Sequence, residues 1–177
     1  MIRVMRDPRP HVGEPLALDL LNTRWMSPEG PRDLLVDVDG LRRWLKTNGL
    51  DRRCDTDEQT RLALVRAREA VLRVVADGDP RELNAVLEQG RVRRALGPAG
   101  PHDEVEVARP EWLPGWLAAE DLLRLVAEAP GRIKQCAHEH CVLWFYDTSK
   151  NGARRWHSMA TCGNRAKAAR HYAAKRD

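Results

Sequence analysis

Apolar residues recur at helical spacing through the first half of the chain. An apolar run over residues 16–21 predicts a short, mostly buried helix. A second helix is expected to begin at Asp39, because an aspartate side chain can accept hydrogen bonds from the free N–H groups of a first turn. Thr56 and Gln59 form a capping-box pattern, which predicts the start of a long helix ending near Gly78.

The pattern changes from helical to alternating after residue 90. Two valines alternate with two glutamates over residues 104–107, behind a break rich in glycine and proline, and this predicts a small β-hairpin. A further apolar helix ends at Pro130-Gly131. The expected fold class is therefore mainly α (α+β), with a helical N-terminal domain over residues 1–131 and a small C-terminal module over residues 132–177.

Three of the four cysteines fall within one short segment of the C-terminal module. Four residues separate Cys136 from Cys141, and four residues also separate His157 from Cys162. Tetrahedral zinc takes four thiolate or imidazole ligands, commonly supplied as two close pairs. These four residues are therefore expected to bind one structural zinc ion. Cys54 stands alone among charged residues and is expected to be an ordinary free thiol.

The chain between the two ligand pairs must bring them together. Asn151-Gly152 favours a tight turn with positive φ, so residues 142–146 and 153–156 are expected to pair as a hairpin. The module would then be a treble-clef-like finger made of a knuckle, a hairpin and a helix. Because this segment has few large apolar groups, the metal would supply most of its stability, and we expect the module and the helical domain to fold independently.

The histidines of the segment leave alternatives for the fourth ligand. His138 and His140 lie between the first two cysteines, and either could take the place of His157. We favour His157 because its separation from Cys162 equals the separation within the first cysteine pair.

A zinc enzyme is one alternative to a structural site. Catalytic zinc keeps one coordination position open for water or substrate, and four protein ligands would close it. Glu139 or Asp147 could be the general base of a metal-dependent hydrolase, although Asp147 also fits a turn. We therefore expect that the protein is not an enzyme.

Positive charge is concentrated at the C-terminal end. From Lys150 onward the chain has eight basic residues and a single acidic one, a net charge of +7, although the whole chain carries only +4. Residues 164–176 are rich in helix formers, and several basic residues share one arc of this expected helix. Such an arc attracts phosphates whatever the base sequence. The residues expected to contact DNA are Arg154, Arg155, Arg165, Lys167, Arg170, His171 and Lys175.

The C-terminal segment resembles the CGNR zinc fingers, named for the tetrapeptide that stands here as Cys162-Gly163-Asn164-Arg165. The likeness extends over Trp144-Phe145, Asp147-Thr148-Ser149 and Arg154-Arg155-Trp156. The family pattern has cysteine where this chain has His157, and three cysteines with one histidine are a common structural zinc set. Upstream, residues 18–23 and Trp25 resemble the start of the ABATE domain, the usual N-terminal partner of that finger.

The resemblance implies a bacterial, stress-responsive transcription regulator whose finger binds DNA and whose N-terminal domain senses an effector. Asn22, Thr23 and Trp25 could line a small-molecule pocket, although Asn-Thr after an apolar helix also fits a cap or turn. Fingers of this kind also serve RNA and protein partners, so an RNA- or protein-interaction module is a second alternative.

A membrane location is not expected from the sequence. The first ten residues are polar and carry three arginines, and no window approaches the roughly 18 apolar residues that a membrane span requires. We expect a cytoplasmic protein, and the sequence leaves its oligomeric state open.

Overall fold

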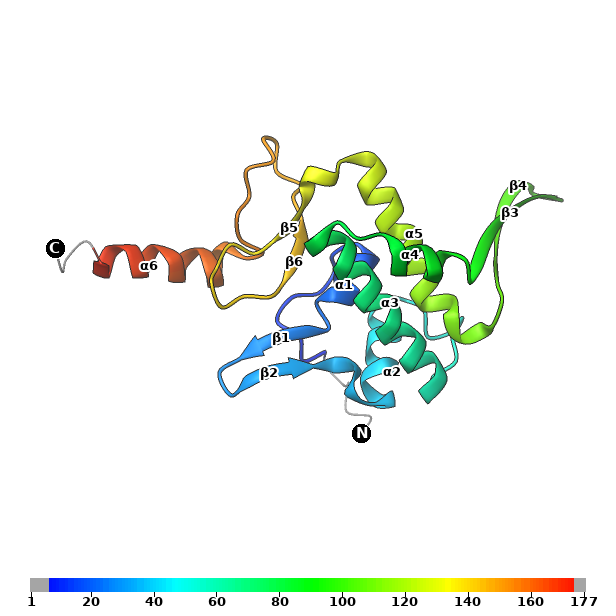
Figure 1. Ribbon diagram of the computed structural model, residues 1–177, viewed down its shortest axis with the longest axis horizontal. Coiled ribbons are helices and arrows are strands. Elements are labelled where there is room, and N and C mark those ends of the chain that lie inside the picture. Colours follow the sequence, from blue (N-terminus) through cyan, green and yellow to red (C-terminus); the bar gives the residue numbers. More distant parts are fainter. Residues whose placement is uncertain (1–6, 174–177) are drawn as a thin grey trace.

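The computed structural model describes residues 7–173, with side chains up to residue 168. The described part is a helical body with three two-stranded antiparallel sheets (Figure 1). Its elements in chain order are α1 (Leu16–Leu21), β1 (Arg24–Ser27), β2 (Gly30–Asp33), η1 (Leu34–Val36), α2 (Val38–Thr47), α3 (Glu58–Asp77), α4 (Arg81–Leu87), β3 (Gly90–Gly97), β4 (Gly100–Val107), η2 (Pro110–Trp112), α5 (Leu113–Glu128), η3 (Pro130–Arg132), β5 (Ile133–Gln135), β6 (Trp144–Tyr146), η4 (Met159–Gly163) and α6 (Asn164–Ala173). The predicted fold class, mainly α (α+β), is confirmed. None of the described helices combines the length and the apolar character that crossing a membrane requires.

The short helix α1 lies at the centre of the body. Its residues Ala17, Leu18 and Leu20 are fully buried, and the helix packs against α3, α5 and strand β6. A helix that is apolar on nearly every side is stable only inside a core. Trp44 of α2 and Leu122 of α5, both fully buried, belong to the same core.

Both predicted helix starts are shifted to a neighbouring aspartate. Asp37 rather than Asp39 caps α2, and Asp57 rather than Thr56 caps α3. Each carboxylate accepts a hydrogen bond of 2.8 Å from the backbone N–H three residues later. Both aspartates have extended backbone immediately before the first helical residue, which is the position that a capping side chain needs. The predicted end of α3 is confirmed, since Gly78 closes it at a φ of +72°.

One hairpin of the body is predicted by the sequence and another is not. Strands β3 and β4 pair along their whole length, from Gly90 with Val107 to Gly97 with Gly100, and extend from the body at the end opposite to α6 (Figure 1). The β1–β2 hairpin has strands of only four residues with no regular alternation of buried and exposed positions, so the periodicity gave no signal for it.

The prediction of a hairpin between residues 142–146 and 153–156 is wrong. β6 pairs with β5, which precedes the first cysteine, while residues 153–156 form no strand. Gly152 does have the expected positive φ, at +58°. The loop that contains it is held by the Lys134 side chain, whose Nζ donates to Gly152 O at 2.5 Å. The loop around Gly152 is therefore held by a lysine side chain of β5 and not by the expected pairing of two strands.

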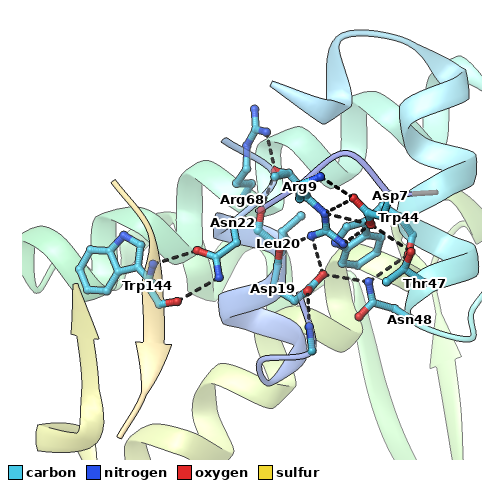
Figure 2. Close-up of polar contacts among 12 residues, drawn as sticks. Asp7, Arg9, Asp19, Leu20, Asn22, Trp44, Thr47, Asn48, Arg68 and Trp144 are labelled. Atoms are coloured by element: carbon cyan, nitrogen blue, oxygen red, sulfur yellow. Dashed lines mark hydrogen bonds and ion pairs between the residues drawn. The ribbon is translucent and has the colours of Figure 1, made fainter. Parts of the chain in front are cut away.

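A buried ion pair ties the N-terminal segment to α1 and α2 (Figure 2). The Arg9 side chain is inaccessible to solvent, and its guanidinium lies 2.8 Å from the carboxylates of both Asp7 and Asp19. Asn48, at the end of α2, donates to the Asp19 carboxylate at 3.0 Å. Buried charges are tolerated when they are paired in this way. Part of the segment that reads as polar in the sequence thus belongs to the interior.

Candidate metal centre

Three cysteines and one histidine come together where β5, β6 and η4 meet. The ligand atoms of Cys136, Cys141, His157 and Cys162 all lie within 4.8 Å of one another, and the Sγ of Cys141 is 3.5 Å from Nδ1 of His157. Zinc–sulfur and zinc–nitrogen bonds of roughly 2.3 and 2.0 Å place tetrahedral ligand atoms about 3.5–3.8 Å apart. The cluster is compatible with one structural zinc ion.

The first ligand pair is held by the β5–β6 sheet. Cys136 directly follows β5, and its N–H donates to Leu143 O at 2.9 Å, which extends the ladder by one pair. The N–H of Cys141 donates to His138 O at 2.9 Å and closes a tight turn between the two cysteines. The knuckle expected from the spacing is therefore formed, between β5 and β6.

Asp147 organises the loop that leads to the second ligand pair. Its side chain is fully buried and accepts hydrogen bonds from Lys134 Nζ at 2.7 Å, Ser149 Oγ at 2.6 Å and Arg154 N at 2.9 Å. Bonding to Lys134, together with Ser149, holds the pKa of this carboxyl well below its usual value. Its oxygens are engaged by protein donors, as a turn residue requires.

Cys162 enters the cluster from η4, a single π-helical turn that leads into α6. The next residue, Gly163, is buried, and a Cβ atom at this position would lie 2.7 Å from Met159 Sδ. The atoms in the way belong to the flexible, half-exposed Met159 side chain, which would have to shift to admit a side chain at this position. Gly163, the second residue of the tetrapeptide, therefore packs closely against Met159.

The surroundings of the cluster fit a bound cation. Burial, with the thiols of Cys136 and Cys162 close by, raises the pKa of Cys141 to about 12, so thiolates here need a compensating positive charge. Burial, with His11 and Arg154 nearby, lowers the pKa of His157 to about 4. The imidazole is therefore neutral at pH 7, and neutral imidazole is the form that binds zinc.

The two alternative histidines lie outside this cluster. The His140 side chain is 78% exposed, and its ring packs edge-on against that of His138 with centroids 6.0 Å apart. The geometry therefore favours His157 as the fourth ligand.

Substitution of the histidines provides a test of the ligand set. His157→Cys should retain zinc, because a thiolate can replace the imidazole, whereas His157→Ala should release zinc faster to a chelator. Metal analysis after a timed chelator challenge measures the difference, with His140→Ala as the matched control. Faster loss from His140→Ala than from His157→Ala would show that the fourth ligand is His140.

Comparison with known families agrees with this geometry. Residues 132–175 match the CGNR zinc finger family. Residues 14–133, more than half of the chain, match the ABATE family, described as "Putative stress-induced transcription regulator". The chain belongs to the ABATE family. It carries a C-terminal CGNR zinc finger. No curated protein matches the chain.

The ABATE body and the CGNR finger share one core. Asn22, fully buried at the end of α1, donates from Nδ2 to Trp144 O at 2.9 Å and accepts from Trp144 N at 2.8 Å (Figure 2). Glu14 accepts from Tyr146 N at 2.8 Å. These two side chains occupy the outer edge of β6, and the Trp144 ring packs among the core residues of the body. The packing therefore joins the parts that were expected to fold independently.

Two of the three residues expected to line an effector pocket are engaged inside the ABATE body. Asn22 holds β6, and the Thr23 hydroxyl donates to Leu20 O at 2.6 Å while accepting from Arg68 at 2.8 Å. Both side chains are fully buried. A cavity lies between the body and the finger, and neither Asn22 nor Thr23 lines it. Of the three residues, only Trp25 lines that cavity.

One N-terminal residue, His11, contacts the cluster residue His157, and a second, Glu14, holds His11; neither was expected from the sequence. The rings of His11 and His157 have centroids 4.9 Å apart, and His11 Nε2 is 2.8 Å from a carboxylate oxygen of Glu14. Glu14 thus contacts both His11 and strand β6. The separation of more than 130 residues between Glu14 and Tyr146 explains why no local pattern revealed these contacts.

The basic residues expected to bind DNA have different positions. Arg155, Arg165 and Lys167 are exposed. Arg154 is turned inward, where its guanidinium donates to Trp156 O and His157 O and lies 4.4 Å from the centre of the Phe145 ring. These contacts hold the loop that carries His157, so the Arg154 guanidinium is not part of the exposed basic surface. Arg170, His171 and Lys175 lie outside the residues whose side chains the structure describes.

Proposed function

We propose that the protein is a DNA-binding transcription regulator, and that the CGNR finger binds DNA through the region where α6 begins. The supporting observation is the position of α6, which extends away from the body with Cys162 of the metal cluster at its base (Figure 1). Arg165 and Lys167 of α6 are exposed, and so is Arg155 in the loop that precedes η4. An accessible cationic helix supplies the part of DNA affinity that does not depend on sequence.

Zinc has a structural role in this proposal. The four ligands would complete a tetrahedral shell and leave no position for a substrate, so we propose a regulator without enzymatic activity. The metal would fix the direction of α6 relative to β5 and β6, because Cys162 lies in the π-helical turn η4 that leads into α6 and Cys136 directly follows β5. The basic side chains would then meet the phosphates in a defined arrangement.

Replacing Arg155, Arg165 and Lys167 together with Ala should weaken DNA binding strongly. Each lost phosphate contact should reduce the slope of log K against log salt by roughly 0.9, so three lost contacts should flatten it by about 2–3. Zinc content and thermal stability should change little, because these side chains are exposed. Fluorescence anisotropy with a labelled duplex at several salt concentrations measures both affinity and slope.

The matched control removes three arginines from the other end of the molecule. Arg91, Arg93 and Arg94 lie on the β3–β4 hairpin, opposite to α6 (Figure 1), and their replacement with Ala should leave the salt slope unchanged. Equal slopes for the two triple variants would contradict the proposed surface. Tighter binding of single-stranded RNA than of duplex DNA at the same salt would instead favour an RNA-binding module.

A genome-wide occupancy map of the tagged protein tests the regulatory part of the proposal. We expect discrete, reproducible peaks that disappear in the triple variant at Arg155, Arg165 and Lys167. Uniform, low occupancy by the unmodified protein would contradict a role as a sequence-specific regulator, even if the finger bound DNA in solution.

A further inference from the structure

A cavity of about 560 Å³ lies between the ABATE body and the CGNR finger. Its walls come from the β1–β2 hairpin, from α3, and from the β5–β6 region of the finger. Trp25 and Leu72 line it from the body, while Trp144 and Val142 line it from the finger. The size is that of a pocket for a small organic molecule, and pockets of this kind are found preferentially at domain interfaces.

Exposed apolar side chains gather around this cavity. Val36 is 67% exposed, Met26 is 46% exposed and Val142 is 40% exposed, and all three line it. They come from β1, from η1 and from the segment that precedes β6, so their convergence is not the by-product of one amphipathic helix. Apolar groups left in water beside a concave apolar surface are typical of a binding site.

The cavity is lined by more positively charged than negatively charged side chains. Arg24, Arg32 and Arg68 line it together with a single carboxylate, that of Asp33. Arg68 is bound to Asp33 by two hydrogen bonds of 2.7 and 2.8 Å, and Arg24 reaches Glu69 at 2.7 Å.

Arg32 is the most exposed and the most weakly paired of the three guanidinium groups that line the cavity. Its side chain is 53% exposed, and its carboxylate contact is a 3.5 Å approach to Glu29, which is itself exposed. A weakly held guanidinium beside an apolar wall suits a ligand with an anionic group at one end.

We propose that this cavity binds a small amphipathic anion, with an apolar, aromatic-sized body between Trp25 and Trp144 and a carboxylate facing Arg32. Of the three residues expected to line a pocket, this site contains Trp25 but neither Asn22 nor Thr23, whose side chains are engaged within the protein. The inference does not depend on DNA binding, because its evidence is the shape and chemistry of the cavity.

The cavity also lies close to the metal cluster along the chain. Gln135 and Trp144 line it and are opposite each other in the β5–β6 register. The next residue after Gln135 is the zinc ligand candidate Cys136, whose N–H bonds to Leu143, the neighbour of Trp144. A ligand that contacts this pair would stabilise the strand end that carries Cys136. Bound ligand is therefore expected to slow the loss of zinc to a chelator.

Filling the cavity mouth gives a direct test with anilinonaphthalene sulfonate, an aromatic anion whose fluorescence rises in apolar sites. Ala76→Trp places a large ring at the cavity, and it should weaken probe binding about tenfold or more. Leu62→Trp, at an exposed position of the same helix outside the cavity, is the control and should bind like the unmodified protein. Thermal denaturation confirms that both variants are folded. Unchanged probe affinity in a folded Ala76→Trp protein would overturn the proposal.

The charge preference is tested by displacing the probe with naphthoate and with the uncharged naphthamide. Naphthoate should compete about fivefold better, and Arg32→Ala should abolish the difference while leaving naphthamide binding intact. Equal competition by the two compounds would overturn the anionic part of the proposal. These titrations contain no nucleic acid, so their failure would be distinguishable from failure of the proposed DNA binding.

Discussion

Replacement of both Cys136 and Cys162 with Ser should lower the zinc content of the purified protein from about one ion per chain to nearly none. A serine hydroxyl is a poor zinc ligand, and the remaining Cys141 and His157 cannot complete a tetrahedral site. Structural zinc contributes directly to folding free energy. The variant should therefore lose protection from hydrogen exchange in β5, β6 and the loop up to α6, as well as losing metal.

How far the loss of hydrogen-exchange protection spreads from the finger into the body distinguishes a shared core from two separate cores. Because Trp144 packs in the core of the body, α1 should also become less protected when zinc is removed. Cys54→Ser is the matched control, since Cys54 is buried in the body and lies outside the cluster. Full zinc content in the double variant would contradict the assignment of the metal centre. Loss of protection confined to residues after 132 would show that the body is stable without the finger.

Trp144→Ala should lower the free energy of unfolding of the whole protein by about 3–5 kcal/mol. The Trp144 side chain is 7% exposed and belongs to the finger by sequence, but it packs among core residues of the body. Its removal leaves a cavity that the surrounding helices can only partly close. Denaturant unfolding, followed by circular dichroism of the helices, measures the change.

A second tryptophan of the finger provides the comparison. Trp156 is only partly buried, and its ring lies 5.3 Å from the Arg155 guanidinium, outside the core of the body. Trp156→Ala should therefore cost clearly less than Trp144→Ala in the same measurement. Equal losses for the two variants would mean that Trp144 does not couple the finger to the body.

The metal centre could be predicted from the sequence because its information is local. The spacing of Cys136 and Cys141, and of His157 and Cys162, indicates two ligand pairs whatever the path of the chain between them. That path was not predictable in the same way. Residues 142–156 contain a turn signal at Asn151-Gly152. β6 nevertheless pairs with β5, a strand that precedes the first cysteine.

Polar residues that have long-range partners could not be assigned from the sequence. Asn22 follows an apolar helix, a sequence context that fits a cap or a turn more often than a pocket wall. Its actual partner is the peptide group of Trp144, 122 residues later in the chain. Arg9 and Arg68 were likewise beyond prediction, because a charged residue is normally exposed unless tertiary structure supplies a partner such as Asp19.

The way in which Asn22 and Glu14 occupy the outer edge of β6 has a consequence for protein engineering. A fusion protein that borrowed residues 132–177 as a cassette would lack both side chains. It would carry an open strand edge beside an uncovered Trp144, and such an edge can pair with other chains. The transplanted finger should therefore bind zinc but aggregate, and adding residues 14–22 on a flexible linker should restore a soluble monomer.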